Sequence, residues 1–123
     1  MEASIQLGAL GQVARTVNDI VAARQWYADV LGLAHLYSFG DLAFFDCAGV
    51  RLFLSQGEGR ASESILYFQV EDVRAAHAAL ASRGVQFTRV PHVVHRHADG
   101  REEWLAEFDD NEGRPLAILS KVG

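Results

Sequence analysis

Apolar residues recur every three or four positions in two segments of the chain, which predicts two amphipathic helices. The first segment follows Asp19, a good N-cap because its carboxylate accepts free backbone N–H groups, and its apolar face comprises Ile20, Ala23, Tyr27, Val30 and Leu31. The second follows Asp72, and its apolar face comprises Val73, Ala76 and Leu80, with Ala79 at the margin. Gly32 and Gly84 stand where a left-handed residue would end each helix.

Runs rich in β-branched and aromatic residues predict strands between and around the helices. They are Gln12–Val17, Leu42–Asp46, Val50–Leu54, Ser64–Val70, Trp104–Phe108 and Leu116–Leu119, with weaker signals at Leu36–Phe39 and Gln86–Val90. Gly49 and Gly113 mark hairpin turns, and Gly57–Ser62 has the composition of a linker.

The chain also contains an internal repeat. Val17–Ala23 matches Val70–Ala76 at an offset of 53, and Phe45–Leu54 matches Asp109–Ile118 at an offset of 64. The larger second offset requires about eleven additional residues, which the stretch His92–Arg101 supplies as a longer connection.

The repeat predicts a single α+β domain over residues 1–123 with internal halves of about 8–56 and 63–121. Each half has one helix, which can cover one face of its sheet, so the other face needs another partner. Two curled half-sheets that meet side by side would enclose a cavity between their open faces, and such a cavity favours a small-molecule site.

Composition narrows the function classes. Of the 123 residues 50% are hydrophobic and 22% charged, as in globular proteins, and the formal charge of −5 gives no electrostatic case for nucleic acid or an anionic membrane. Met1–Gly8 lacks the pattern of a signal peptide, and no apolar run is long enough to span a bilayer. The single cysteine, Cys47, fits a reducing compartment. We expect a cytoplasmic protein.

Several segments in a fixed order resemble one family. These are Gln12–Asp19, Trp26-Tyr27 followed by Val30–Leu33, the hairpin Leu42–Leu52, and the turn Asp110–Leu116. Together they resemble the glyoxalase / bleomycin resistance protein / extradiol dioxygenase (vicinal oxygen chelate) superfamily over nearly the whole chain. The resemblance implies paired βαβββ modules that form a cupped mixed sheet with helices on its outer face.

Metal-dependent members of that superfamily hold a divalent metal with four side chains on the open sheet face. The resemblance transfers these positions to Gln12, Phe53, Ile65 and Ala117, and the repeat offsets relate them in the same register. Phe, Ile and Ala have no donor atom, and the amide oxygen of Gln12 alone is a weak ligand. We therefore predict no metal or other cofactor, unless a divalent metal uses a non-standard ligand set.

Strand alternation assigns further residues to the cavity. Ile65, Tyr67 and Gln69 share one face of their strand, and Glu103, Leu105 and Glu107 share one face of theirs. The predicted ligand-binding residues are Gln12, Phe53, Ile65, Tyr67, Gln69, Leu105 and Ala117. By the same alternation Arg15 falls on the helix-covered side, where it would reach the edge or pair with an acid.

Glu107 is the candidate catalytic residue, because a carboxylate in an apolar cup can act as a general base or anchor a cationic ligand. The alternative is a rim carboxylate paired with a nearby Arg or Lys. His92, His95 and His97 lie close together before Glu102 and Glu103, but we interpret the stretch as a solvated loop that could close over a ligand. Cys47 has no neighbouring base, so a nucleophilic role is not expected.

Three hypotheses follow. The first is a metal-free protein that binds an apolar or aromatic small molecule in the cup. The second is a lyase, isomerase or dioxygenase-type enzyme of the same superfamily that uses displaced metal ligands or Glu107. The third is a structural or regulatory partner whose cup is filled by its own side chains. A homodimer is expected from the resemblance, and exposed sheet edges make it physically reasonable.

Overall fold

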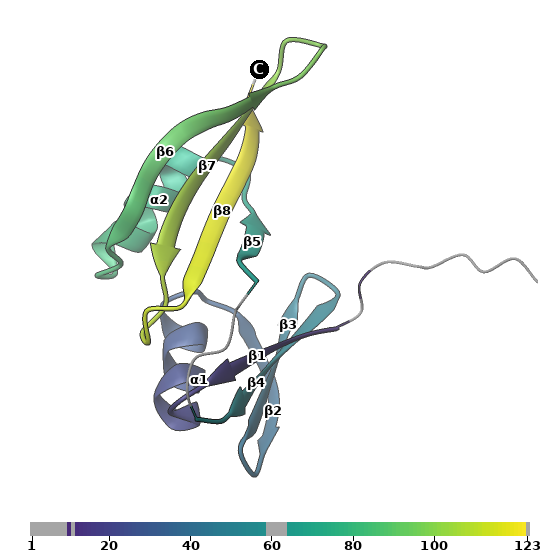
Figure 1. Ribbon diagram of the computed structural model, residues 1–123, viewed down its shortest axis with the longest axis vertical. Helices are drawn as coiled ribbons and strands as arrows, with labels where there is room; N and C mark the ends of the chain where they lie inside the picture. The colour runs from purple at the N-terminus through teal and green to yellow at the C-terminus, as the bar shows by residue number, and fades with distance from the viewer. Residues whose placement is uncertain (1–9, 11, 59–63, 123) are drawn as a thin grey trace, which may run out of the picture.

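Two βαβββ modules follow one another along the chain in the computed structural model, which describes residues 10, 12–58 and 64–122 (Figure 1). The N-module comprises β1 (Gln12–Val17), α1 (Ile20–Asp29), β2 (Ala34–Phe39), β3 (Leu42–Cys47) and β4 (Val50–Gln56). The C-module comprises β5 (Leu66–Gln69), α2 (Val73–Ser82), β6 (Phe87–Arg96), β7 (Glu102–Asp109) and β8 (Pro115–Val122). The predicted α+β fold of two paired modules is confirmed.

Each module forms a four-stranded mixed sheet, with strand order β1-β4-β3-β2 in the N-module and β5-β8-β7-β6 in the C-module. The first and last strands of each module pair in parallel, and the other neighbours are antiparallel. Each helix covers one face of its own sheet (Figure 1). The boundary residues 8 and 63 of the predicted halves, most of the Gly57–Ser62 linker and the segment Met1–Gly8 lie outside the described residues.

Both helices begin where the sequence predicts, and α2 ends just before Gly84, whereas α1 ends at Asp29, so Val30 and Leu31 follow the helix instead of belonging to its face. The carboxylate of Asp19 accepts a hydrogen bond from the Ala22 N–H, and that of Asp72 accepts from the Arg74 and Ala75 N–H groups. Gly32 and Gly84 have φ angles of +73° and +91°, which residues with a Cβ adopt only with strain. In the described part of the chain neither ten-residue helix is long and apolar enough to cross a membrane.

The repeat is real, but its second offset needs a correction. β4 and β8 are equivalent at the offset of 64, since Leu52 and Leu116 hold the same place. Phe45 pairs with Leu52, whereas Phe108 pairs with Leu116, so β3 and β7 are equivalent at an offset of 63. The additional residue lies in the β7–β8 turn, which is therefore longer than the β3–β4 turn.

The predicted loop His92–Arg101 is wrong, because β6 continues to Arg96 and pairs with β7 as a long hairpin. Pro91 obscured this strand, since proline has no N–H for a sheet ladder. β6 lies at the sheet edge, and its pairing shifts between Arg89 and His92, so the proline is tolerated there. His92 and His95 therefore belong to a strand and not to a lid.

Arg15 joins the two modules. It lies on the helix side of β1, as alternation predicts, and is only 5% exposed. Its guanidinium donates to the Tyr27 hydroxyl at 3.2 Å and to the carbonyl oxygens of Ser64 and Pro115 at 3.0 and 2.6 Å. The Tyr27 hydroxyl in turn donates to the buried Asp110 carboxylate at 2.7 Å. Of the two predicted outcomes, Arg15 does not reach the sheet edge; it is linked to the Asp110 carboxylate through the Tyr27 hydroxyl.

Glu112 completes this contact from the β7–β8 turn. Its two carboxylate oxygens accept the backbone N–H groups of Asn18 and Asp19 at 2.6 and 2.8 Å, just before α1. Arg114, buried beside it, donates to Glu112 at 3.2 Å. We call Arg15, Tyr27, Asp110, Glu112 and Arg114 the junction cluster.

Burial shapes the ionisation of this cluster. Burial and the nearby Asp110 carboxylate raise the pKa of the Tyr27 phenol well above its ordinary value, so the hydroxyl stays a donor. Burial opposes the charge on Glu112, but the N–H groups of Asn18 and Asp19 and the Arg114 guanidinium hold the pKa of that carboxyl below its usual range. The β7–β8 turn is thereby fixed against α1, because the negatively charged Glu112 carboxylate lies at the N-terminus of that helix.

Candidate functional site

The open face of the N-module sheet carries a row of aromatic side chains. Cross-strand pairing sets Phe53 beside Phe44 and Phe44 beside Tyr37. The ring centroids lie 5.2 Å apart for Phe44 and Phe53 and 4.6 Å apart for Phe44 and Tyr37, in stacked geometry. Phe39 stacks beside both Tyr37 and Phe44, at 6.1 and 5.8 Å. We call Tyr37, Phe39, Phe44 and Phe53 the aromatic row.

Arg51 lies in the cross-strand row next to the aromatic row, and it binds the amide oxygen of Gln12. Its Nε donates to the Gln12 Oε1 at 2.7 Å, and its guanidinium carbon lies 5.4 Å from the centre of the Phe44 ring. Asp46 is its cross-strand neighbour on the other side. The amide oxygen that could have bound a cation therefore faces a guanidinium instead, and that fixed positive charge disfavours a metal ion at this point.

The other three positions taken from the metal-binding pattern divide between the modules. Phe53 belongs to the aromatic row, whereas Ala117 lies on the C-module sheet beside Tyr67, and Ile65 precedes β5. No three His, Cys, Asp or Glu side chains in the described part of the chain gather closely enough to hold a metal ion. The residues present do not fit the metal of the family, and a metal-free site stays a prediction.

The open face of the C-module sheet consists of two neighbouring rows. Register places Tyr67, Ala117, Glu107 and Arg89 across the four strands in one row, and Gln69, Leu119, Leu105 and His92 in the next. Five of the predicted binding or catalytic residues are thus on one face, as alternation predicts. Whether they contact a ligand stays a prediction.

Glu107 lies directly opposite Arg89 on the edge strand. Opposite charges at facing positions of an antiparallel pair attract one another. Arg89 is exposed and Glu107 is half-buried, so the pair lies at the border between the sheet face and solvent. This placement favours the rim carboxylate over the general base.

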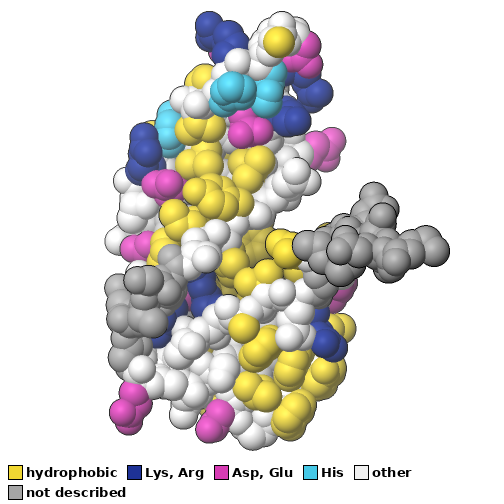
Figure 2. Space-filling view, turned by 45° about the vertical axis from the view of Figure 1, so that its right-hand side comes forward, with side chains coloured by type: hydrophobic (Ala, Val, Ile, Leu, Met, Phe, Trp, Pro, Cys, Tyr) yellow, Lys and Arg dark blue, Asp and Glu magenta, His cyan; other side chains and the backbone are white. Residues whose placement is uncertain are grey.

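The open faces remain accessible to solvent in a single chain. Phe39 is 59% exposed, Tyr37 43% and Tyr67 52%, although all three are large and apolar or amphipathic. The two sheets are separate and share no strand pairing among the described residues. Figure 2 shows apolar side chains gathered on both modules, along the upper one and on the lower one. The cavity predicted between the half-sheets is therefore not closed by these faces within one chain.

The histidines of β6 and the following turn lie at the far end of the C-module. The rings of His95 and His97 are 4.5 Å apart, and the His97 Nε2 lies 3.7 Å from a Glu103 carboxylate oxygen. His92 contacts the Val90 carbonyl oxygen through its Nδ1 at 2.7 Å. These contacts stabilise the hairpin end, and they lie away from the aromatic row of the other module.

Sequence reasoning missed most of the aromatic row. Tyr37, Phe39 and Phe44 were not assigned to a face, because the strand Leu36–Phe39 gave a weak signal and a register shift interrupts its pairing between His35 and Tyr37. The signal that could have found them is the pair Phe44-Phe45, whose side chains must point to opposite faces. Phe45 is fully buried under α1, so Phe44 must lie on the open face.

Comparisons with known proteins agree with the fold of two βαβββ modules. A model of the Glyoxalase/Bleomycin resistance protein/Dioxygenase superfamily matches residues 9–113. The crystal structure of a lactoylglutathione lyase from Agrobacterium tumefaciens superimposes with a TM-score of 0.74 at 21% identity, over 93% of this chain and 94% of that one.

Two further solved structures are similar at equally low identity. A glyoxalase/bleomycin resistance protein/dioxygenase from Nocardioides gives a TM-score of 0.78 at 15% identity, over 97% of this chain and 87% of that one. An integron cassette protein from the mobile metagenome of V. cholerae gives 0.75 at 20% identity, over 95% and 98%. None of the curated proteins matches the chain. At such identities these neighbours support the fold and leave the chemistry open.

Proposed function

Because the chain belongs to the Glyoxalase/Bleomycin resistance protein/Dioxygenase superfamily, we propose that it binds an aromatic or apolar small molecule on its open sheet faces without a metal. The aromatic row carries this proposal. Four neighbouring rings on one sheet face offer a planar ligand stacking partners, and stacked pairs stabilise by about 0.5–1.5 kcal/mol beyond the area they bury.

The replacement of the metal positions supports the same function. Reactions that polarise a substrate oxygen with a metal need several donor side chains around one point. Here the amide oxygen of Gln12 is taken by Arg51, and Phe53, Ile65 and Ala117 have no donor. Phe53 instead adds a ring to the aromatic row, and Ala117 is fully buried beside Tyr67.

A homodimer would close the cup. Monomers rarely expose large contiguous apolar patches, whereas Phe39, Tyr37 and Tyr67 are exposed on the open faces of this chain. A second copy that places its C-module face over the aromatic row would cover both and leave the ligand between them. The symmetric exchange would repeat the arrangement on the other side.

Titration of the purified protein with 2-naphthol, a neutral planar probe, tests the binding proposal. Phe53→Ala removes one stacked ring, so the affinity is expected to fall about tenfold, which corresponds to about 1.4 kcal/mol. Val21→Ala on the outer surface of α1 is the control and should leave the affinity unchanged. Equal affinity of Phe53→Ala and the parent chain would rule out the aromatic row as the site.

Two further measurements test the metal and the dimer. Calorimetry with Zn²⁺, Ni²⁺ and Fe²⁺ should show no equimolar binding, and a tight one-to-one complex would contradict the metal-free proposal. Sedimentation velocity at micromolar concentration should show a dimer that Phe39→Glu converts to monomer, because a buried carboxylate opposes association. A parent chain that sediments as a monomer would contradict the shared cup.

The enzymatic alternative rests on Glu107, which shares its row with Tyr67 on the C-module open face. In that case a substrate would bind equally well to Glu107→Gln while its turnover is abolished. The cross-strand position of Arg89 makes catalysis by Glu107 the second candidate, because a facing positive charge favours the ionised carboxylate at the border with solvent.

A further inference from the structure

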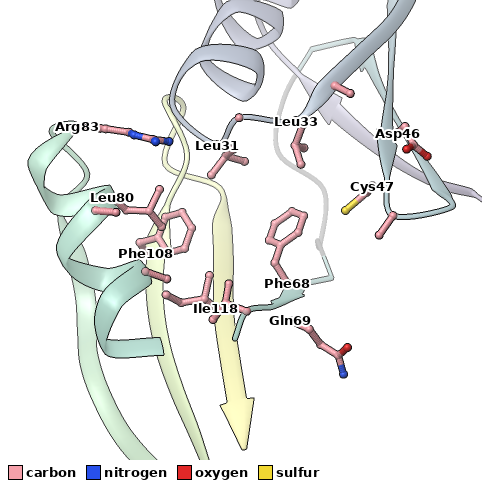
Figure 3. Close-up of a pocket in the computed structure, with 16 residues that line it drawn as sticks. Leu31, Leu33, Asp46, Cys47, Phe68, Gln69, Leu80, Arg83, Phe108 and Ile118 are labelled. Carbon is pink, nitrogen blue, oxygen red and sulfur yellow. The ribbon is translucent and has the colours of Figure 1, made fainter. Parts of the chain in front are cut away.

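A pocket of about 520 Å³ lies at the contact between the two modules, on the side that carries the helices (Figure 3). It is formed by the segment after α1 and the β3–β4 turn of the N-module, and by β5, α2, β7 and β8 of the C-module. Its apolar wall comprises Leu31, Leu33, Phe68, Leu80, Phe108 and Ile118. This volume and lining are typical of small-molecule sites.

The pocket is the counterpart of the junction cluster in the internal repeat. Arg15 pairs with Leu54, and Phe68 pairs with Ile118 at the equivalent place of the other sheet. Counted from the two N-caps, Tyr27 of α1 is equivalent to Leu80 of α2. A guanidinium and a phenol that hold the modules together on one side are thus replaced by Phe68 and Leu80 on the other.

Asp110 of the junction cluster is replaced as well, by Cys47. Asp110 and Cys47 are each the residue after the equivalent strand positions Asp109 and Asp46. Trp26, which packs against both cores, is equivalent to Ala79 by the same count from the caps. The small Ala79 and the shorter β3–β4 turn leave a pocket of about 520 Å³ on this side. On the other side, Trp26 and the longer β7–β8 turn line a smaller pocket of about 370 Å³.

Polar groups lie only at the margins of this pocket. Arg83 donates from Nη1 to the Val30 carbonyl oxygen at 2.8 Å, which holds its guanidinium near Gly32, and its other N–H groups are available to a ligand. Asp46 lies at the opposite side, where its carboxylate accepts the Gly49 N–H at 3.1 Å (Figure 3). Gln69 points away from Phe68 (Figure 3).

We propose that this pocket is a second binding site, separate from the open sheet faces, for a small apolar molecule that carries one carboxylate. The apolar body packs among Phe68, Leu80 and Ile118. The carboxylate accepts hydrogen bonds from Arg83 at the end of the pocket away from Asp46. A molecule bound in the pocket contacts both modules. Binding therefore stabilises the contact between the β3–β4 turn and the C-module, which has no counterpart of the junction cluster.

Cys47, the one cysteine of the chain, lines the pocket and reports on its occupancy. Burial raises the pKa of its thiol, with a further contribution from Asp46, so alkylation is slow and easily followed at pH 8. The probe is 4-phenylbutyrate. At about nine times its Kd, about one pocket in ten remains empty, so alkylation by iodoacetamide should slow about tenfold.

Ala79→Trp tests where the probe binds, because it places in the pocket the ring that Trp26 provides on the equivalent side. In this variant 4-phenylbutyrate should no longer change the alkylation rate. Ala78→Trp is the matched control on the exposed side of α2, and it should keep the full tenfold protection. Titration of 2-naphthol into Ala79→Trp should give the parent affinity, which separates this pocket from the aromatic row.

Two measurements complete the test without relying on that one variant. Methyl signals of Leu33, Leu80 and Ile118 in the parent chain should shift on titration with 4-phenylbutyrate. Arg83→Met, an exposed position, should weaken 4-phenylbutyrate about threefold and leave 4-phenylbutanol unchanged. Absence of protection and of methyl shifts at millimolar probe would overturn the proposal, as would full protection that persists in Ala79→Trp. Equal affinity of acid and alcohol in the parent chain would overturn the role of Arg83.

Discussion

The two hairpin turns that approach the opposite module do so with different chemistry. The β7–β8 turn reaches α1 and holds it through Arg15, Tyr27, Asp110 and Glu112. The β3–β4 turn is one residue shorter and meets a wall of Phe68 and Leu80, with a pocket between them. Pockets line both contacts, but the one beside the β7–β8 turn is smaller, about 370 Å³ against about 520 Å³. A repeat preserves backbone geometry, while the side chains at equivalent positions determine whether a polar cluster or apolar packing holds the modules together.

The contact that the junction cluster holds should depend most strongly on Arg15. Arg15→Met removes a buried guanidinium and leaves the Tyr27 hydroxyl and two carbonyl oxygens without their donor, so unfolding in urea should show a loss of about 3 kcal/mol. Phe68→Met at the equivalent position changes only apolar packing and should cost about 1 kcal/mol. Equal costs at the two positions would mean that the cluster stabilises the chain no better than apolar packing does.

Tyr27→Phe tests the link between guanidinium and carboxylate. It removes the hydroxyl that accepts from Arg15 and donates to Asp110, both buried, so we expect a loss of about 2 kcal/mol in the same unfolding measurement. Tyr37→Phe removes an exposed hydroxyl 3.4 Å from Arg51 and should cost less than about 0.5 kcal/mol. A Tyr27→Phe variant as stable as Tyr37→Phe would contradict the hydrogen-bonded link from Arg15 through Tyr27 to Asp110.

Glu112→Gln should have the smallest effect, about 1 kcal/mol at neutral pH. The folded-state pKa of Glu112 is lowered, so its contribution is present above the unfolded value of about 4.3 and is lost as the pH falls through the folded pKa. The stability curves of the variant and the parent chain should therefore converge below about pH 4. Glu58→Gln, at an exposed position, serves as the control and should follow the parent curve throughout. A difference for Glu112→Gln that does not decrease as the pH falls below about 4 would exclude the charge as its cause.

Local patterns identified most of the elements for clear physical reasons. The Asp19 and Asp72 caps and the glycines after each helix satisfy backbone groups locally, so a short stretch of sequence specifies them. Alternation placed Tyr67, Leu105 and Glu107 on one face, because successive strand side chains must point to opposite sides. β6 was missed beyond Val90, since an edge strand tolerates the proline that would exclude a central one.

The candidate site was less accessible to the same reasoning. Gln12 and Phe53 were correctly placed on the open face, but the hydrogen bond from Arg51 to Gln12 depends on the parallel register of β1 and β4, which lie 39 residues apart at this pair. The aromatic row likewise depends on the pairing of three strands. Which rings stack is a property of register, and a shift of two residues would preserve the faces and change every neighbour.

The sequence by itself determined the modules: two helices with their caps, the strands, the repeat and the faces to which most side chains point. These follow from local periodicity and from backbone groups that are satisfied nearby. Only the tertiary structure decided how the modules meet, because that contact depends on residues about 80 to 100 positions apart, such as Tyr27 with Asp110 and Arg15 with the Pro115 carbonyl oxygen. It also revealed the larger pocket lined by Phe68 and Leu80, since a pocket is a property of packing that no single segment contains.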